Sequence, residues 1–144
     1  MMHLIFVYGT LKSGQIRNNV LRDQRYIGIA TTEPQYAMFQ ISGFPALVDS
    51  VKAVADGQPA PNRRVWGELY EVDEDCIAEL DKIEGVSRNL FERREVKLDE
   101  TWPSYLPTNG DVFANFFRKT AEAYIYKQSV AGAKECGSFW CHKF

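Results

Sequence analysis

The first apolar segment of the chain reads Leu4-Ile5-Phe6-Val7-Tyr8-Gly9-Thr10-Leu11-Lys12-Ser13-Gly14. Its apolar residues predict a buried strand that stops abruptly at Gly9. Glycine has no Cβ atom, so the backbone at Gly9 can take unusual dihedral angles and approach a ligand closely. The backbone amides after Gly9 can then converge into a small nest that binds an anion. The plainer interpretation is a tight turn between this strand and the next element.

The composition is that of an ordinary globular protein. The chain has 144 residues, of which 45% are hydrophobic and 25% are charged, and its net charge is −2 at pH 7. This size predicts a single domain over residues 1–144. The charge gives no reason to expect nucleic acid or an anionic membrane as a partner. The apolar run after Met1 is too short for a signal peptide core or a membrane span.

Three cysteines are present, Cys76, Cys136 and Cys141. An odd number of cysteines does not suggest a disulfide framework, so a reducing, cytoplasmic location is expected. The spacing of Cys136, Cys141 and His142 fits no zinc pattern, and no metal is expected there.

The periodicity predicts mostly strands and two short helices. Strands or extended segments are expected at residues 4–8, 26–32, 36–41, 44–48, 65–72, 91–98 and 121–126. Helices are expected at 16–21 and from the capping residue Asp73 to Gly85, and loops at 56–62 and 101–111. This set predicts a mainly β, α+β fold, in which a curved mixed or antiparallel sheet or a small barrel carries helices outside.

Glu84 is a carboxylate on the apolar face of the second predicted helix. It follows Leu80 by four residues, so it lies on the same side as Ile77 and Leu80. Desolvation beside a pocket would raise its pKa and suit it to proton transfer near neutral pH. The alternative is an exposed carboxylate in the last helical turn. Glu79 and Asp81 are expected to face solvent.

Five ordered segments, followed by a strand at 123–126, carry a resemblance to a known superfamily. They are Val7-Tyr8-Gly9-Thr10-Leu11-Lys12-Ser13-Gly14, Phe44-Pro45-Ala46-Leu47-Val48, Val65-Trp66-Gly67-Glu68-Leu69-Tyr70-Glu71-Val72, Leu80-Asp81-Lys82-Ile83-Glu84-Gly85 and Leu90-Phe91-Glu92-Arg93-Arg94-Glu95-Val96. In the order and spacing of these segments, the chain resembles the gamma-glutamylcyclotransferase-like superfamily. The lysine and glycine after Tyr-Gly-Thr-Leu are most similar to the gamma-glutamylamine cyclotransferase branch. Over residues 50–64 and 101–117, where elongated loops are expected, the resemblance is weak.

The resemblance implies a six- or seven-stranded barrel with short flanking helices and a cavity at one end. It implies that Tyr8, Gly9, Thr10 and Leu11 form a substrate-binding loop and that Glu84 is the catalytic acid/base. The implied substrate is a small gamma-glutamyl compound whose α-amine attacks its own γ-carbonyl carbon. This tethered attack releases 5-oxoproline and an amine, and it requires no metal or cofactor.

Other functions stay open at this stage. A binding module on the same barrel would hold a small carboxylate or a peptide end, although it would need no ionisable group at Glu84. The same chemistry could remove a gamma-glutamyl protecting group from a biosynthetic intermediate, or act on glutathione. The sequence leaves open the leaving amine, the oligomeric state and whether residues 50–64, 101–117 and the tail after Ser129 cover the cavity.

Overall fold

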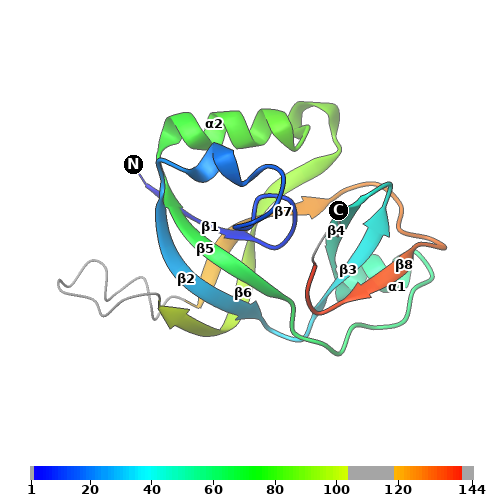
Figure 1. Ribbon diagram of the computed structural model, residues 1–144. Helices are drawn as coiled ribbons and strands as arrows, with labels where there is room; N and C mark the ends of the chain where they lie inside the picture. The colour runs from blue at the N-terminus through cyan, green and yellow to red at the C-terminus, as the bar shows by residue number, and fades with distance from the viewer. Residues whose placement is uncertain (1, 104–118, 141–144) are drawn as a thin grey trace.

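The fold is built from strands, as the alternating and apolar runs predict. The computed structural model describes residues 2–103 and 119–140 (Figure 1). The strands are β1 His3–Val7, β2 Arg25–Thr32, β3 Tyr36–Ile41, β4 Phe44–Asp49, β5 Trp66–Val72, β6 Phe91–Pro103, β7 Thr120–Tyr126 and β8 Lys134–Gly137. The helical elements are α1 Ser50–Ala55, α2 Glu74–Ile83 and the 3-10 turns η1 Asn18–Leu21 and η2 Val86–Arg88.

Five strands close into a barrel in the order β1-β5-β2-β6-β7. β1 pairs with β5 in antiparallel and with β7 in parallel orientation, so the barrel is mixed. Successive residues of a strand point to opposite faces. Phe6 and Leu69 accordingly belong to one core cluster, whereas Ile5 and Tyr70 belong to a second one that includes Leu80 of α2. β1 is therefore buried on both faces, which explains its continuous apolar sequence.

Three further strands form a second sheet, in the order β4-β3-β8, beside the barrel (Figure 1). The chain leaves the barrel at Pro34, which has no N–H group with which to extend the ladder of β2. This turn directs β3 and β4 into the second sheet. The predicted fold class is therefore confirmed, while the barrel itself closes with five strands instead of six or seven.

Residues 50–55 form helix α1 instead of the expected loop. The Asp49 carboxylate accepts a hydrogen bond from the Lys52 amide at 2.9 Å and so caps the helix. The side chains of Val51 and Val54 are 78% and 55% exposed, and Ala53 is the buried residue of this helix. The larger apolar residues of α1 point outward, so its sequence lacks the amphipathic periodicity from which a helix is predicted. The predicted loop at 56–62 does lie outside strands and helices.

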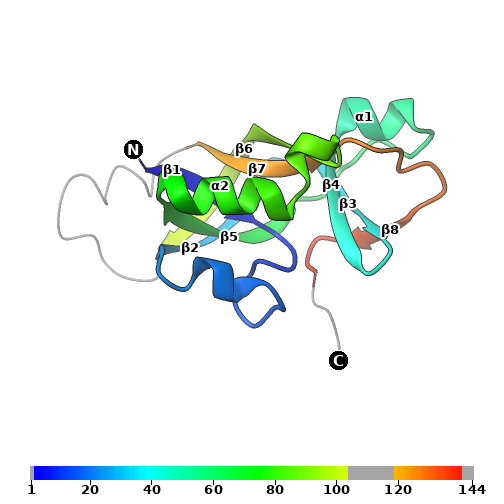
Figure 2. The ribbon, with the colours of Figure 1, turned by 90° about the horizontal axis from the view of Figure 1, so that it is seen from above.

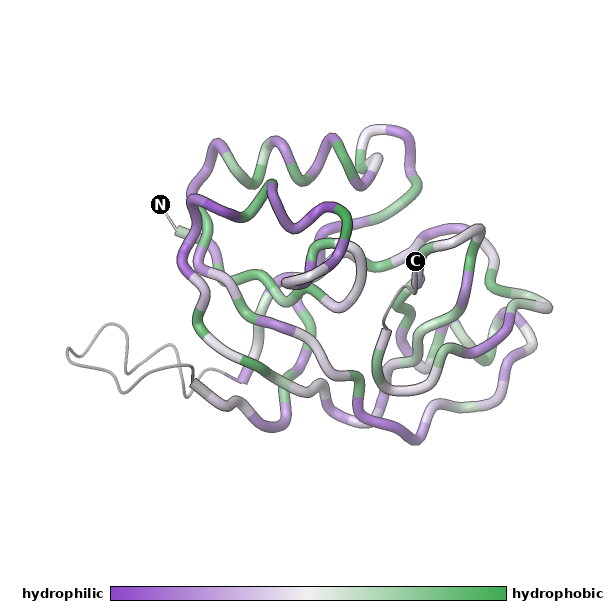
Figure 3. Tube along the Cα trace, viewed as in Figure 1, coloured by the Kyte–Doolittle hydropathy of each residue, from purple (hydrophilic) through white to green (hydrophobic). Residues whose placement is uncertain are grey.

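Helix α2 lies on the outside of the barrel and α1 beside the second sheet (Figures 1 and 2). Hydrophilic and hydrophobic residues alternate at short intervals along α2 (Figure 3), as expected of a helix with one buried face. Within residues 2–103 and 119–140, none of the helices is long and apolar enough to cross a membrane. Residues 104–111 of the second predicted loop, together with Cys141 and His142, lie outside the described residues, and 101–103 extend β6.

Both predicted ends of α2 are confirmed. The Asp73 carboxylate accepts a hydrogen bond from the Cys76 amide at 2.8 Å, which satisfies one of the helix's first N–H groups. At the other end Glu84 is the last residue with helical backbone angles, and Gly85 takes a φ of 67°. Such a left-handed glycine ends a helix and sets the direction of the chain that follows.

Replacement of Asp73 with alanine is expected to lower the free energy of unfolding by about 1 kcal/mol, because the Cys76 amide loses its acceptor. Urea denaturation at pH 7 measures this change. Asp75→Ala is the matched control, since Asp75 lies in the same turn but does not cap the helix. Equal unfolding midpoints for the two variants would show that the cap contributes nothing.

Candidate active site

A cavity of about 360 Å³ lies between the barrel and the β3–β4 hairpin. The loop after β1, the hairpin turn, the end of α2 and strand β7 all contribute to its wall. The wall includes Tyr8, Gly9, Thr10, Leu11, Arg17, Ser42, Pro45, Glu84, Arg88 and Tyr124. The structure therefore places all five sequence-predicted site residues around one cavity, although 73 to 76 positions separate the loop from Glu84 in the sequence.

Tyr8 fixes the start of the loop. Its side chain is buried, and its hydroxyl donates a hydrogen bond to the Tyr124 carbonyl at 2.5 Å. The same hydroxyl accepts a longer hydrogen bond, 3.4 Å, from the Leu47 amide. Tyr8 thus ties the end of β1 to β7 and β4, and its hydroxyl is occupied by these structural contacts.

Gly9 is required for close packing. A Cβ atom at this position would lie 2.6 Å from Cγ of Pro45, a distance that real Cβ atoms essentially never show. Gly9 does not belong to the glycines with positive φ, so the expectation of an unusual backbone conformation is wrong. The absence of a Cβ instead lets the Pro45 ring approach the loop and form the adjoining cavity wall.

The carbonyl groups of Gly9, Thr10 and Leu11 all accept hydrogen bonds. Gly9 accepts from the Lys12 amide at 3.1 Å, Thr10 from the Arg17 amide at 2.8 Å, and Leu11 from Asn18 Nδ2 at 2.8 Å. Within the described part of the chain, the amides of Gly9, Thr10 and Leu11 donate no hydrogen bond. Three consecutive unsatisfied donors beside a cavity are a suitable receptor for a carboxylate.

Glu84 is half-buried at the end of α2, and its side chain lines the cavity. Burial raises the pKa of its carboxyl group from 4.5 to about 7, against the opposing effect of the Arg17 charge. Burial also raises the pKa of both Tyr8 and Tyr124, and the nearby charge of Glu84 adds to each shift. The alternative of an exposed, last-turn carboxylate is therefore wrong. Among the described residues, nothing hydrogen-bonds the Glu84 carboxylate.

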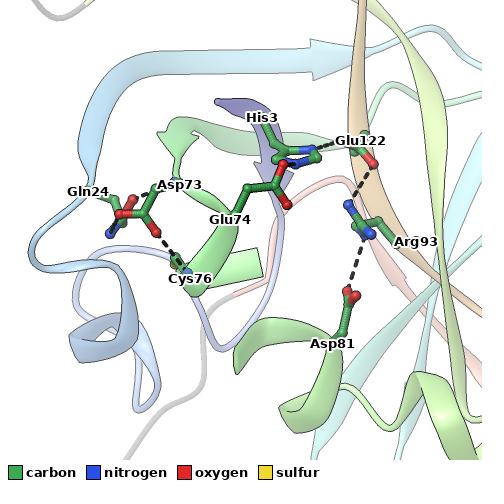
Figure 4. Close-up of polar contacts among 8 residues, drawn as sticks. All are labelled: His3, Gln24, Asp73, Glu74, Cys76, Asp81, Arg93 and Glu122. Carbon is green, nitrogen blue, oxygen red and sulfur yellow. Dashed lines mark hydrogen bonds and ion pairs between the residues drawn. The ribbon is translucent and has the colours of Figure 1, made fainter. Parts of the chain in front are cut away.

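Asp81 faces the protein, and the expectation that it points to solvent is wrong. Its Oδ1 accepts a hydrogen bond from the Tyr124 hydroxyl at 2.7 Å and lies 3.2 Å from Arg93 Nε. Arg93 also pairs with Glu122 at 3.1 Å, and Glu122 contacts His3 at 2.6 Å (Figure 4). This chain of contacts holds Tyr124 in place as a wall of the cavity. Glu79, by contrast, is exposed as expected.

Two arginines of the cavity wall had no signal in the sequence. Arg17 follows the loop and Arg88 follows α2, and both side chains are exposed at the rim. Neither residue belongs to an apolar period or a capping pattern, so only the fold reveals that they share a site.

Among the described residues, those of segments 50–64 and 129–140 do not line the cavity. The described tail packs elsewhere. There the Lys12 ammonium donates a hydrogen bond to the Trp140 carbonyl and lies 3.5 Å from the centroid of the Phe139 ring.

The family of the chain follows from a match over nearly its whole length. A family model described as gamma-glutamyl cyclotransferase, AIG2-like, matches residues 5–141. The chain belongs to the AIG2-like gamma-glutamyl cyclotransferase family. This assignment confirms the resemblance found in the sequence and places the chain in a family of enzymes.

Individual relatives agree with this assignment. The chain is 30% identical over 133 residues to gamma-glutamylaminecyclotransferase A of Danio rerio, covering 88% of this chain and 69% of that protein. It is 38% identical over 103 residues to the gamma-glutamylaminecyclotransferase of Rattus norvegicus, covering 65% and 62%. The match thus spans about two thirds of these relatives. The crystal structure of an AIG2-like protein from Mus musculus superimposes with a TM-score of 0.56 at 25% identity, covering 88% of this chain and 77% of that one.

Proposed function

We propose that this protein cyclises a gamma-glutamyl amine and releases 5-oxoproline and the free amine, with Glu84 as the general acid/base. The observation that carries the proposal is the half-buried Glu84 carboxylate, which shares a cavity with the unsatisfied amides of residues 9–11. The amine class follows the names of the zebrafish and rat relatives. The free thiols of Cys76 and Cys136 support a cytoplasmic location.

The loop would hold the glutamyl part of the substrate. Its α-carboxylate would accept hydrogen bonds from the amides of Gly9, Thr10 and Leu11, which have no other acceptor in the described residues. A volume of about 360 Å³ suits a small molecule. A substrate held in this way inside a confined cavity can fold so that its α-amine approaches its own γ-carbonyl carbon.

Glu84 would then carry two protons in succession through the reaction. As a carboxylate it takes a proton from the α-ammonium group, and the resulting amine attacks the γ-carbonyl carbon to form the ring C–N bond. The protonated Glu84 gives this proton to the leaving nitrogen as the original C–N bond breaks. Glu84 then takes the second proton from the ring nitrogen, which leaves 5-oxoproline with one N–H, and passes it to the released amine. The enzyme ends in its starting protonation state, and no protein nucleophile is needed. A pKa of about 7 suits both steps at neutral pH.

The pH dependence of kcat/KM is expected to report this group. Because the carboxylate form of Glu84 must start the reaction, kcat/KM should fall about tenfold per pH unit below its pKa of about 7. Initial rates of 5-oxoproline release between pH 5 and pH 9 measure the profile. An acid limb near the ordinary glutamate value of 4.5 would contradict the assigned role of this carboxyl group.

The function itself is tested by incubating the protein with gamma-glutamyl-lysine, gamma-glutamyl-alanine and glutathione and measuring 5-oxoproline. Release from a gamma-glutamyl amine is expected, and a reaction without protein gives the spontaneous rate. If substrates bind but none is cyclised, the protein is a binding module and the proposed enzyme activity is wrong.

A further inference from the structure

We infer that Asp81 is a positioning residue of the active site, which holds the Tyr124 hydroxyl group away from the Glu84 carboxylate. Within the described residues, Glu84 is thereby left without a hydrogen-bond donor. The inference concerns the side chain proposed as the general acid/base, so its meaning for catalysis rests on the proposed function. Asp81 does not itself line the cavity and acts through Tyr124, which does.

Tyr124 connects Asp81 to the cavity. Its hydroxyl donates a hydrogen bond to Oδ1 of Asp81 at 2.7 Å, and Tyr124 and Glu84 line the same cavity. Asp81 and Glu84 are three positions apart at the end of α2, so they are neighbours on one side of the helix. A Tyr124 hydroxyl that lost Asp81 would therefore have the Glu84 carboxylate as the neighbouring acceptor.

Asp81 is itself held by a cation. Its Oδ1 lies 3.2 Å from Nε of Arg93, and Arg93 also pairs with Glu122 at 3.1 Å (Figure 4). Arg93 and Tyr124 are directly paired residues of β6 and β7, so their side chains lie on the same face of the sheet. The guanidinium thus fixes the Asp81 carboxylate beside the tyrosine, and a charged acceptor binds a hydroxyl more strongly than a neutral one.

The backbone of Tyr124 is held independently of its side chain. Its carbonyl group accepts the hydrogen bond of the Tyr8 hydroxyl at 2.5 Å, and β7 pairs with β6 on both sides of this position. Loss of the Asp81 carboxylate should therefore release the Tyr124 hydroxyl while β7 and the cavity stay in place.

The other charged and titratable groups of the cavity wall come from separate elements. Arg17 after β1 and Arg88 of η2 lie at the rim, and the Arg17 charge favours the ionised form of Glu84. Tyr8 faces the same cavity, but its hydroxyl already donates to the Tyr124 carbonyl. Among the described residues, β6 and the β3–β4 hairpin contribute no titratable side chain to the wall. The Tyr124 hydroxyl is thus the donor whose release would change the surroundings of Glu84.

The contact between Asp81 and Tyr124 preserves the basicity of Glu84. A carboxylate that accepts a hydrogen bond is a weaker base, because the bond stabilises its charged form. By occupying the tyrosine hydroxyl, Asp81 leaves burial as the main influence on Glu84, whose pKa is about 7. The proposed proton transfers at neutral pH depend on this value.

Titration of Glu84 in the free protein tests the inference. Carbon-13 NMR of protein labelled at the glutamate carboxyl carbons follows the group, and the resonance missing from Glu84→Gln identifies it. Asp81→Ala should lower the pKa of Glu84 from about 7 to about 6 or below, because the released hydroxyl donates to the carboxylate. The double variant Asp81→Ala/Tyr124→Phe lacks that hydroxyl, so its Glu84 should again titrate near 7.

The variants separate the hydrogen bond from the charge of Asp81. Loss of the charge alone would lower the pKa of Glu84 equally in Asp81→Ala and in the double variant. Asp81→Asn is the matched control, since it keeps an acceptor oxygen for Tyr124 and should leave the pKa of Glu84 near 7. Asp81→Leu has nearly the same shape and no acceptor, and it repeats the test if Asp81→Ala folds poorly.

Steady-state kinetics with gamma-glutamyl-alanine gives the catalytic readout. In Asp81→Ala the acid limb of kcat/KM should move to lower pH together with the pKa of Glu84, and kcat at pH 8 should fall about threefold with little change in KM. An unchanged pKa in Asp81→Ala, or an equal fall in this variant and the double variant, would overturn the inference. Because the NMR titration needs no substrate, absence of cyclisation by the wild-type protein would overturn the proposed function alone.

Discussion

Replacement of Glu84 with glutamine is expected to lower kcat by about 10²–10⁴-fold, the usual contribution of a general acid/base. Glutamine has nearly the same shape but cannot take a proton from the α-ammonium group. The amides of residues 9–11 are unchanged in this variant, so substrate affinity should change little. Release of 5-oxoproline measures kcat, and calorimetric titration with a gamma-glutamyl substrate measures affinity.

Two controls separate catalysis from folding in this experiment. Glu79→Gln changes an exposed carboxylate of the same helix and should retain full activity. The pKa of the Glu84 carboxyl group is about 7 in the folded protein and 4.5 when it is not buried. Its burial therefore costs least stability below pH 4.5, where the group is protonated in both the folded and the unfolded state, and the folded state loses stability as the pH rises through 7. Glu84→Gln should therefore be at least as stable as the wild-type protein toward urea at pH 8. Wild-type turnover in Glu84→Gln would disprove the mechanism.

Replacement of Gly9 with alanine is expected to raise KM at least about tenfold. The new Cβ atom would lie 2.6 Å from Cγ of Pro45, so the loop or the hairpin must move. Displacement by even part of an ångström would disturb the three amides of residues 9–11, which in the proposed function bind one carboxylate together. Steady-state kinetics with gamma-glutamyl-alanine measures KM, and circular dichroism shows whether the variant is folded.

The double variant Gly9→Ala/Pro45→Ala tests the cause of that effect. It removes the Cγ atom that the new Cβ would meet, so it should recover much of the lost affinity relative to Gly9→Ala. The single variant Pro45→Ala completes the cycle and reports any direct contribution of the proline ring. A normal KM in Gly9→Ala would show that neither the close packing nor the loop position matters for binding.

The sequence predicted those parts of the fold that depend on local patterns. Asp73 and Gly85 mark the two ends of α2 by their own capping chemistry, and the spacing from Leu80 places Glu84 on the buried face. Strands β1 to β7 were also predicted, because alternation and apolar runs are properties of short segments, whereas β8 at Lys134–Gly137 was not. The approximate site therefore followed from a strand that ends at Gly9 and a carboxylate in an apolar position.

The remaining features depend on contacts between distant residues. The only local signal for α1 is the cap formed by Asp49, because Val51 and Val54 are exposed. The inward orientation of Asp81 follows from its contacts with Arg93 and Tyr124 on neighbouring strands. Arg17 and Arg88 likewise share the cavity only because the fold brings the loop and the end of α2 together.

The parallel pairing of β1 with β7 also determines when the cavity can form during folding. Tyr8 and Tyr124, which are joined by a hydrogen bond beside the cavity, are 116 positions apart in the sequence. Contacts of such long range form slowly, because the chain loses much conformational entropy before they stabilise it. A nascent chain that ends before β7 can pair β1 with β5 but has neither a closed barrel nor the Tyr124 wall. The binding loop is thus synthesised first, yet its pocket is among the last parts of the molecule to be completed.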